Sequence, residues 1–304
     1  MQIRLAETAG FCFGVERAVA LAEQTARDCK NAVTLGPIIH NRHVVARFEL
    51  LGLREISAAD EAQPGQTVVI RAHGIPVGEQ RTLSARGAVT VDATCPFVKK
   101  IHVIAQKAER DGRSLLIIGT PTHPEVEGIA GWCTACKIFD SADSLKKWVT
   151  EERIAADLPI CMVCQTTSTE NLWKLCRNFA KKQFTNLKIF DTLCKATEDR
   201  QTEAASLSRE CQAMVVVGDA KSSNTGRLAM ICREYCDRVA LVDDASELEP
   251  AFFAGITDVG ITAGASTPAW IIKEVNKTMS EITNAEAVQE ENFAELLEQS
   301  IKTL

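Results

Sequence analysis

Three cysteines share one sequence context, in which the cysteine directly precedes a segment with helical periodicity. They are Cys12, Cys95 and Cys194, out of twelve cysteines in the chain. A thiol at a helix N-terminus has its pKa lowered by the helix dipole, which favours the thiolate. Thiolates are the cysteine form that binds zinc and iron–sulfur clusters. The three positions therefore predict a metal centre to which distant parts of the chain contribute one thiolate each.

A constant spacing connects each of these cysteines with a polar residue that follows an apolar, strand-like segment. The residues found 28 positions after the three cysteines are His40, His123 and Ser222. Each segment then contains a second apolar run followed by a polar residue, at offsets of 61, 71 and 72 from its cysteine. These second residues are His73, Thr166 and Ser266. Three equal offsets are not expected of unrelated segments, so the chain is predicted to repeat one structural unit three times.

The repeat supplies three cysteines and no fourth equivalent, which favours an iron–sulfur cluster over structural zinc. Structural zinc usually takes four ligands that come in locally spaced pairs. A cluster held by three thiolates leaves one iron open, and that iron is a Lewis acid as well as an electron donor. We therefore expect one 4Fe–4S cluster with Cys12, Cys95 and Cys194 as its ligands.

Two CxxC pairs offer an alternative zinc site. Cys133 and Cys136 form one pair, and Cys161 and Cys164 form the other, 28 residues further on. Such pairs can hold zinc, but the second pair falls in an apolar strand, where alternate side chains point to opposite faces. Packing is therefore the preferred interpretation of this quartet, as it is for the remaining five cysteines.

Short apolar strands alternate with helical segments along the chain, which predicts α/β units with mainly parallel sheets. The predicted strands are Ala32–Leu35, Thr67–Arg71, Ser114–Ile118, Pro159–Val163, Ala213–Val217 and Val259–Thr262. The predicted helices include Val15–Arg27, Val98–Arg110 and Ala196–Arg209. The predicted fold class is α/β, with three similar small units in pseudo-threefold symmetry around a central iron–sulfur cluster. The units are expected at residues 1–94, 95–193 and 194–280, and the tail 281–304 is expected to be helical.

Polar side chains that follow the strands are predicted to bind an anion, because ligands of α/β sheets bind beyond the carboxyl ends of the strands. The candidates are His40, His73, His123, Thr166, Ser222, Ser223, Asn224 and Ser266. Imidazoles, hydroxyls and helix N-terminal amides, with few lysines among them, suit a diphosphate in a small pocket. His43 and His102 fall inside predicted helices and are interpreted as structural.

Glu125, two residues after His123, is the predicted proton donor. A carboxyl group near a negatively charged cluster and a diphosphate would have a raised pKa, which suits a general acid. Thr166 and Thr167 are the predicted proton relay. Glu127 is interpreted as a solvated or structural residue.

Composition excludes several functional classes. The net charge of −6 argues against a nucleic-acid-binding protein. No apolar run approaches about 20 residues and the N-terminus lacks the apolar stretch of a signal peptide, so neither a membrane span nor secretion is expected. Cysteines in a reducing compartment are more often metal ligands or catalytic groups than disulfides, and we expect a cytoplasmic protein that acts on a small molecule.

A set of motifs resembles one known family. In chain order they are GFCFGVERA, LGPIIHN, RAHG, DATCPFV, HPEVEG, QTT, TLCKAT, SSN and TAGAST. Together they resemble the 4-hydroxy-3-methylbut-2-enyl diphosphate reductases over about residues 1–275. The resemblance implies three α/β units around a 4Fe–4S cluster on the three cysteines, with Glu125 as proton donor. It assigns the eight polar candidates named above to the substrate, chiefly to its diphosphate.

The reaction implied by this resemblance is the reductive dehydroxylation of an allylic alcohol, the last step of the non-mevalonate isoprenoid pathway. The products would be isopentenyl diphosphate and dimethylallyl diphosphate, and the electron donor would be a ferredoxin or flavodoxin. Two departures from the family pattern, Pro121-Thr122 before His123 and Lys195 after Cys194, affect no proposed ligand. The rival interpretations are a cluster-bearing electron carrier or sensor without catalysis, and a zinc-stabilised binding protein.

Overall fold

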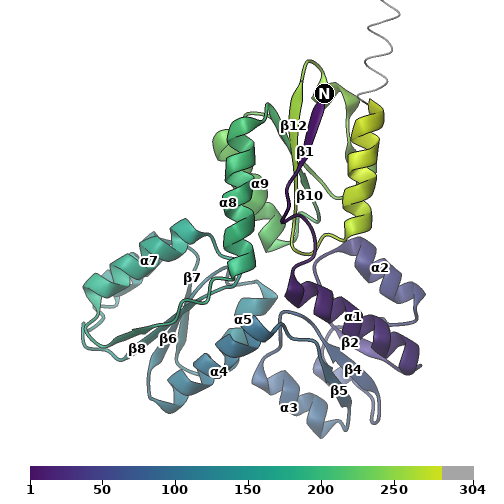
Figure 1. Ribbon diagram of the computed structural model, residues 1–304. Coiled ribbons are helices and arrows are strands. Elements are labelled where there is room, and N and C mark those ends of the chain that lie inside the picture. The colour runs from purple at the N-terminus through teal and green to yellow at the C-terminus, as the bar shows by residue number, and fades with distance from the viewer. Residues whose placement is uncertain (283–304) are drawn as a thin grey trace, which may run out of the picture. The chain divides into compact units, whose positions relative to one another are not determined.

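The computed structural model describes residues 1–282, so the predicted helical tail lies outside the described residues from 283 onward. The chain divides into two compact bodies. The larger body is Phe11–Gln201, and the smaller body combines Met1–Gly10 with the chain from Thr202 onward. The larger body contains two parallel four-stranded sheets and the smaller body contains one (Figure 1). The predicted α/β class with three sheet units is therefore confirmed.

The first sheet of the larger body has the strand order β3-β2-β4-β5. Its strands are β2 (Val33–Leu35), β3 (Arg54–Ile56), β4 (Thr67–Ile70) and β5 (Val89–Asp92). The helices of this segment are α1 (Phe13–Asp28), α2 (Arg42–Leu50) and α3 (Val77–Ala85), with a short 3₁₀ helix at Ala59–Glu61. Residues of β2 and β4 are buried, as expected for the inner strands of a parallel sheet.

The second sheet of the larger body has the equivalent order β7-β6-β8-β9. Its strands are β6 (Ser114–Ile118), β7 (Cys136–Phe139), β8 (Ile160–Cys164) and β9 (Leu187–Ile189). The helices are α4 (Pro96–Arg110), α5 (Pro124–Ala130), α6 (Ala142–Glu151) and α7 (Glu170–Gln183). Alternate residues of β6 enter separate cores on the two faces: Leu115 and Ile117 pack on one side, Leu116 and Ile118 on the other.

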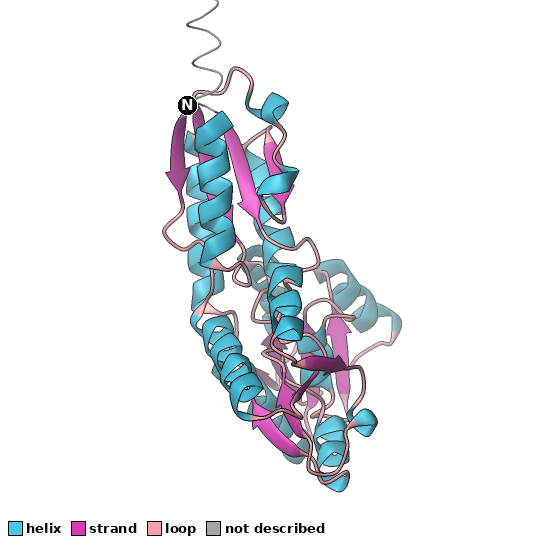
Figure 2. Ribbon diagram, turned by 90° about the vertical axis from the view of Figure 1, so that its right-hand side faces the viewer, coloured by secondary structure: helices cyan, strands magenta, loops and turns pink. Residues whose placement is uncertain are grey.

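The smaller body contains the third sheet, in the order β1-β12-β10-β11. Its strands are β1 (Gln2–Leu5), β10 (Ala213–Val217), β11 (Val239–Val242) and β12 (Asp258–Ala263). Helix α9 (Ser223–Tyr235) and the end of α8 (Lys195–Glu210) pack on one face, and a helix at 269–282 packs on the other. Helices thus lie on both sides of these strands (Figure 2). Two 3₁₀ helices, Ala245–Glu247 and Pro250–Phe253, connect β11 with β12.

In all three sheets the strand that leads toward a cysteine occupies one edge. Strand β5 precedes Cys95, β9 precedes Cys194, and β1 precedes Cys12. Strand β1 lies within the predicted unit 1–94, but it pairs with β12 in the third sheet, with Gln2 beside Asp258. Each sheet is therefore completed by the strand that introduces the next cysteine, and the third sheet is completed by the start of the chain.

A glycine follows one inner strand in each sheet at an equivalent position. The backbone N–H groups of Gly36, Gly119 and Gly218 donate to the carbonyls that end the neighbouring strands, at 2.9, 2.9 and 2.8 Å. A Cβ atom at Gly119 would lie 2.8 Å from Cβ of Gln165 and 2.9 Å from Val126. The glycine therefore permits a close approach between the polar loops beyond β6 and β8.

Among residues 1–282, no helix combines the length and the apolar character needed to cross a lipid bilayer.

Replacing Gly119 with Ala is expected to destabilise the protein by about 1–3 kcal/mol, because the added methyl group would overpack a filled site. Gly78→Ala is the matched control, since a Cβ at Gly78 in α3 would meet nothing within 4 Å. That control should stabilise the fold by up to about 1 kcal/mol through helix propensity. Urea denaturation measures both free energies of unfolding; equal stability of the two variants would contradict the proposed crowding at Gly119.

Candidate functional site

The three cysteines stand at the starts of three helices, as predicted. Cys12 and Cys95 are the N-cap residues of α1 and α4, and Cys194 directly precedes α8. The carbonyl of each cysteine accepts a helical hydrogen bond from the residue four positions later, at 2.9–3.1 Å. All three are free thiols of intermediate exposure. The three sulfurs are therefore partly shielded from water but still accessible to a bound metal centre.

Backbone hydrogen bonds attach two of these cysteines to the loops that contain the predicted polar residues. The N–H of Cys95 donates to the carbonyl of Ala72 at 2.9 Å, next to His73. The N–H of Cys194 donates to the carbonyl of Thr166 at 3.0 Å. Each bond places a thiol and a candidate substrate-binding residue on adjacent backbone segments.

The starts of α1 and α4 are held in contact. A Cβ atom at Gly14 would lie 2.5 Å from Sγ of Cys95, so only a glycine at this position leaves room for that sulfur. The Arg17 guanidinium donates to the carbonyls of Asp92 and Thr94, at 3.3 and 3.2 Å. These contacts bring Cys12 and Cys95 into one region of the larger body.

Burial governs the acidity of these thiols. The pKa of Cys95 is raised to about 11, mainly by burial and also by the charges of Cys12 and Cys194, while backbone N–H groups of α4 oppose the shift. Burial also raises the pKa of Cys194. The prediction that the helix dipole lowers these pKa values is therefore wrong for Cys95 and Cys194, because desolvation outweighs the amide bonds at the helix start. A bound cation favours the thiolate and reverses this balance.

The three cysteines do not form the compact ligand group of this structure. Among residues 1–282, the set of three or more side chains grouped closely enough to hold one metal ion is His40, His73 and His123, whose ligand atoms lie within 4.8 Å of one another. Three thiolates on one zinc ion would lie roughly 3.8 Å apart, given tetrahedral zinc–sulfur bonds of about 2.3 Å. Cys12 and Cys194 nevertheless contribute to raising the pKa of Cys95, as expected of thiols that share one region. Three such thiols suit a cluster in which each thiolate would bind a different iron.

The two CxxC pairs do not form a zinc site. Cys161 and Cys164 enter different hydrophobic cores on opposite faces of their sheet, as the strand pattern predicts. Cys133 donates instead to the Glu109 carboxylate at 3.2 Å. Cys176, Cys211, Cys232 and Cys236 are buried in the cores, which confirms their interpretation as packing residues.

Three histidines from separate loops meet in the larger body. The ring of His40 lies 4.7 Å from that of His73 and 5.7 Å from that of His123, and the last two rings are 5.5 Å apart. Burial lowers the pKa of His73 well below its usual value, and the nearby His40, His123 and Arg71 lower it further. The three rings therefore suit an anion, because a negative charge among them would favour the protonated, positively charged form of each imidazole.

His123 has a defined orientation because it caps the helix that contains Glu125. Its Nδ1 accepts a hydrogen bond from the backbone N–H of Glu125 at 3.1 Å. An accepting Nδ1 in a neutral imidazole assigns the ring proton to Nε2. His123 therefore offers a donor on the side away from the helix.

Glu125 and Thr166 form a buried pair. The backbone N–H of Thr166 donates to Oε1 of Glu125 at 2.6 Å, and the hydroxyl of Thr166 donates to Oε2 at 2.7 Å. Glu125 is 2% exposed, whereas Glu127 is exposed, as predicted. The hydroxyl of Thr167 accepts from Gln165 at 2.9 Å. The raised pKa expected for Glu125 stays a prediction.

Gln165 is a structural member of this site that the sequence analysis did not identify. Its side chain is completely buried, and Oε1 accepts from the backbone N–H of Thr120 at 3.0 Å. Because Gln165 also donates to Thr167, it connects the His123 loop with the Thr166 loop. Its place between β8 and Thr166 in the QTT motif was the available signal.

The smaller body contains a second group of polar side chains. Ser222 caps α9, and its hydroxyl lies 3.3 Å from that of Ser266, which donates to it. Asn224 is 4% exposed, and neither Oδ1 nor Nδ2 has a hydrogen-bond partner. Ser223, the residue before Asn224, is half-buried. An unpaired buried amide costs about 1–3 kcal/mol, so Asn224 has the character of a ligand-binding group.

The chain is similar to known proteins over most of its length. The family model described as LytB protein matches residues 3–280. The 4-hydroxy-3-methylbut-2-enyl diphosphate reductase of Nitratiruptor sp. is 39% identical over 93% of this chain and 99% of that protein. The protein of the same name from Aquifex aeolicus is 37% identical over 95% of this chain and 99% of its own length.

Solved structures are similar too. One is (E)-4-hydroxy-3-methyl-but-2-enyl diphosphate reductase, described as the terminal enzyme of the non-mevalonate pathway. It is 36% identical with a TM-score of 0.66, over 92% of this chain and 100% of that one. The E-1-hydroxy-2-methyl-but-2-enyl-4-diphosphate reductase from Plasmodium falciparum is 25% identical with a TM-score of 0.84, over 91% and 86% of the two chains.

Because His102 is buried, we expect the folded protein to lose stability in mild acid. Burial lowers the pKa of His102 from 6.5 to about 4. Between these pH values the unfolded chain binds a proton that the folded chain does not, so the free energy of unfolding falls as the pH falls, by about 1.4 kcal/mol per pH unit. His102→Gln should therefore lose about 2 kcal/mol less than the wild type between pH 7 and pH 5. Urea denaturation at both pH values measures this difference, and equal losses would contradict the shifted pKa.

Proposed function

The chain belongs to the LytB protein family and is an oxidoreductase, and we propose that it reduces 4-hydroxy-3-methylbut-2-enyl diphosphate. The proposed products are isopentenyl diphosphate and dimethylallyl diphosphate, formed in the last step of the non-mevalonate isoprenoid pathway. The observation that carries this proposal is the arrangement of the larger body, where three helix-capping cysteines accompany a histidine triad and a buried glutamate–threonine pair.

We assign one 4Fe–4S cluster to Cys12, Cys95 and Cys194. Their separate positions in the chain, their common place at helix starts and the room that Gly14 leaves for the Cys95 sulfur support this assignment. When bound, such a cluster supplies electrons and an open iron that acts as a Lewis acid. Burial raises the pKa values of Cys95 and Cys194, so loading of the cluster is expected to release protons.

The histidine triad is the proposed binding site for the diphosphate. The rings of His40, His73 and His123 lie within 4.7–5.7 Å of one another. A diphosphate would replace the repulsion between protonated rings with charge-assisted hydrogen bonds. The second polar group, of Ser222, Ser223, Asn224 and Ser266, is assigned to the same substrate by its motifs, and the unpaired amide of Asn224 supports that role.

Glu125 and Thr166 are the proposed proton-transfer pair. A protonated Glu125 would pass its proton to Oγ1 of Thr166, 2.7 Å away, while that hydroxyl passes its own proton to the leaving hydroxyl of the substrate. The 2.6 Å hydrogen bond from the backbone N–H of Thr166 fixes the orientation of the Glu125 carboxyl group toward the Thr166 hydroxyl. Burial of both side chains limits water near the reacting atoms.

The proposed partners follow from this chemistry. The substrate is a small allylic diphosphate, and the electrons come from a donor of the ferredoxin or flavodoxin type. The net charge of −6 does not favour a nucleic-acid partner, because the phosphate backbone is itself negatively charged. A cytoplasmic location stays a prediction.

The proposal is tested by metal analysis and turnover under anaerobic conditions. The purified protein should contain about four iron atoms and four acid-labile sulfides per chain. With a chemical reductant it should consume the allylic diphosphate and release both isomeric products, each quantified. Zinc without sulfide would overturn the cluster assignment. A loaded cluster that is reduced and reoxidised without consuming the diphosphate would instead indicate an electron carrier.

Glu125→Gln should lower kcat by about 10²- to 10⁴-fold, the usual contribution of a positioned general acid. The amide preserves the size of the side chain and can still meet the Thr166 hydroxyl, so the cluster spectrum should be unchanged. Glu127→Gln, on the exposed side of the same helix, is the matched control and should keep wild-type kcat. Near-normal turnover by Glu125→Gln would refute the proton-donor role.

A further inference from the structure

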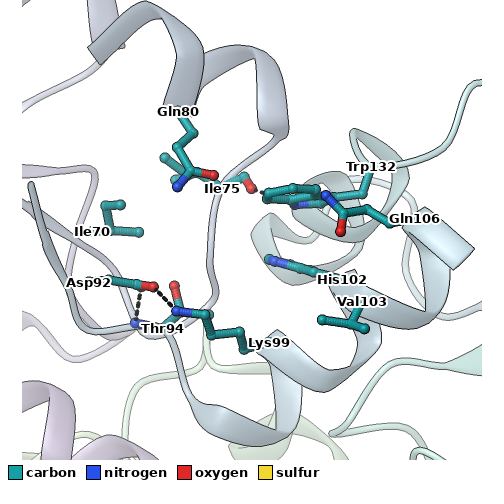
Figure 3. A pocket seen from close by; sticks show the side chains of 10 residues that line it. All are labelled: Ile70, Ile75, Gln80, Asp92, Thr94, Lys99, His102, Val103, Gln106 and Trp132. Carbon is teal, nitrogen blue, oxygen red and sulfur yellow. Dashed lines mark hydrogen bonds and ion pairs between the residues drawn. The ribbon is translucent and has the colours of Figure 1, made fainter. Parts of the chain in front are cut away.

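A cavity of about 190 Å³ lies in the larger body, outside the proposed substrate and cluster sites. Figure 3 shows His102 projecting from α4 into the region between Trp132 and the Lys99 side chain. The cavity has a mainly apolar lining that includes Ile70, Ile75 and Val103. His102 is only 6% exposed, so its role depends on what its ring contacts.

One edge of the His102 ring meets the turn that contains His73. A Cβ atom at Gly74 would collide with Cε1 of His102 and lie 3.0 Å from its Nε2. Gly74 also has a φ of +73°, a conformation that favours glycine. The backbone next to His73 therefore rests directly against the imidazole.

Trp132 supports His102 and the same turn. The two rings stack with centroids 5.3 Å apart and an interplanar angle of 24°. The indole Nε1 of Trp132 also donates to the carbonyl of Ile75 at 3.0 Å (Figure 3). His102 and Trp132 thus contact consecutive residues after His73, and the neutral His102 ring adds no charge there at neutral pH.

Other elements complete the enclosure of the turn. Arg71 donates through Nε to the carbonyl of Gly74 at 3.3 Å. On the side of α5, a Cβ at Gly128 would lie 3.4 Å from the carbonyl oxygen of His73. The turn is therefore packed against α5, and the cavity beside His102 is a free volume into which it would relax if the ring were removed.

We propose that His102 is a positioning residue for His73, and that it sets the affinity of the histidine triad for a diphosphate. Cys95 is the N-cap of α4, and His102 lies within the same helix, seven residues further on. One rigid helix thereby links a proposed cluster ligand to the support of a proposed diphosphate ligand. This inference rests on the proposed function for the identity of the anion.

The test uses anaerobically purified, cluster-loaded protein and compares His102→Ala with the wild type. The Kd for inorganic diphosphate, measured by calorimetry, and the KM for the allylic substrate should both rise at least about tenfold, as for loss of about 1.4 kcal/mol of binding. The kcat value should stay within about threefold, because Glu125 and Thr166 are unaffected. Gln106→Ala, one turn further along α4 and lining the same cavity, is the matched control and should keep wild-type values.

A double-variant cycle tests the contact itself. Gly74→Ala should weaken diphosphate binding through its collision with the ring, and His102→Ala should relieve part of that effect. The double variant should therefore bind more tightly than the two single effects predict when added. Additive effects would overturn the direct contact as the cause.

A second substitution keeps the test decisive if His102→Ala does not fold. His102→Leu fills the apolar surroundings but presents a branched tip to Gly74, so it should also raise the Kd for diphosphate. Wild-type Kd and KM in either folded His102 variant, or equal losses in Gln106→Ala, would overturn the positioning role. Failure of the loaded wild type to turn over the allylic substrate would refute the proposed function instead, and the calorimetric comparison would still report on His102.

Discussion

The site depends on one backbone arrangement, in which a cysteine begins a helix while its own N–H is bonded to the loop beyond a neighbouring strand. Cys95 donates to Ala72 and Cys194 donates to Thr166, at 2.9 and 3.0 Å. A single hydrogen bond therefore ties the backbone of each cysteine to a loop that contains a proposed substrate-binding residue. Because the bond belongs to the backbone, the side chains on both sides remain available for chemistry. The glycines beyond the inner strands and the contact of Gly14 with Cys95 are the packing conditions under which these loops can approach.

Desolvation gives the site its electrostatic character. Burial raises the pKa values of Cys95 and Cys194 and lowers those of His73 and His102, so it favours the neutral form of every one of these groups. A neutral, partly dry site responds strongly to charge, because opposite charges interact more strongly there than in water. Iron and diphosphate would each bring the charge that the corresponding side chains need in order to ionise. The same burial explains why the expected dipole effect on the thiols is outweighed.

The sequence was most informative where burial is uniform. The six predicted strands are the inner two of each sheet, whose residues are apolar on both faces. The outer strands escaped prediction because they are short and include charged residues, such as Arg54 and Glu55 in β3. Spacing predicted which cysteines begin helices, but the pairing of Glu125 with Thr166 joins residues 41 positions apart and needs the folded sheet. The structural role expected for His102 agrees with its burial, but its contact with Gly74 could not be predicted, since that contact depends on how α4 packs against a distant turn.

The pairing of β1 with β12 also affects how the protein is made. Gln2 is synthesised 256 residues before its partner Asp258. At about 5–20 residues per second, the first strand waits roughly 10–50 seconds for the edge it completes. During that interval the strands of both sheets of the larger body, which end with Ile189 in β9, are synthesised and can pair. Translation therefore imposes an order in which the sheet that contains the start of the chain is the last to close.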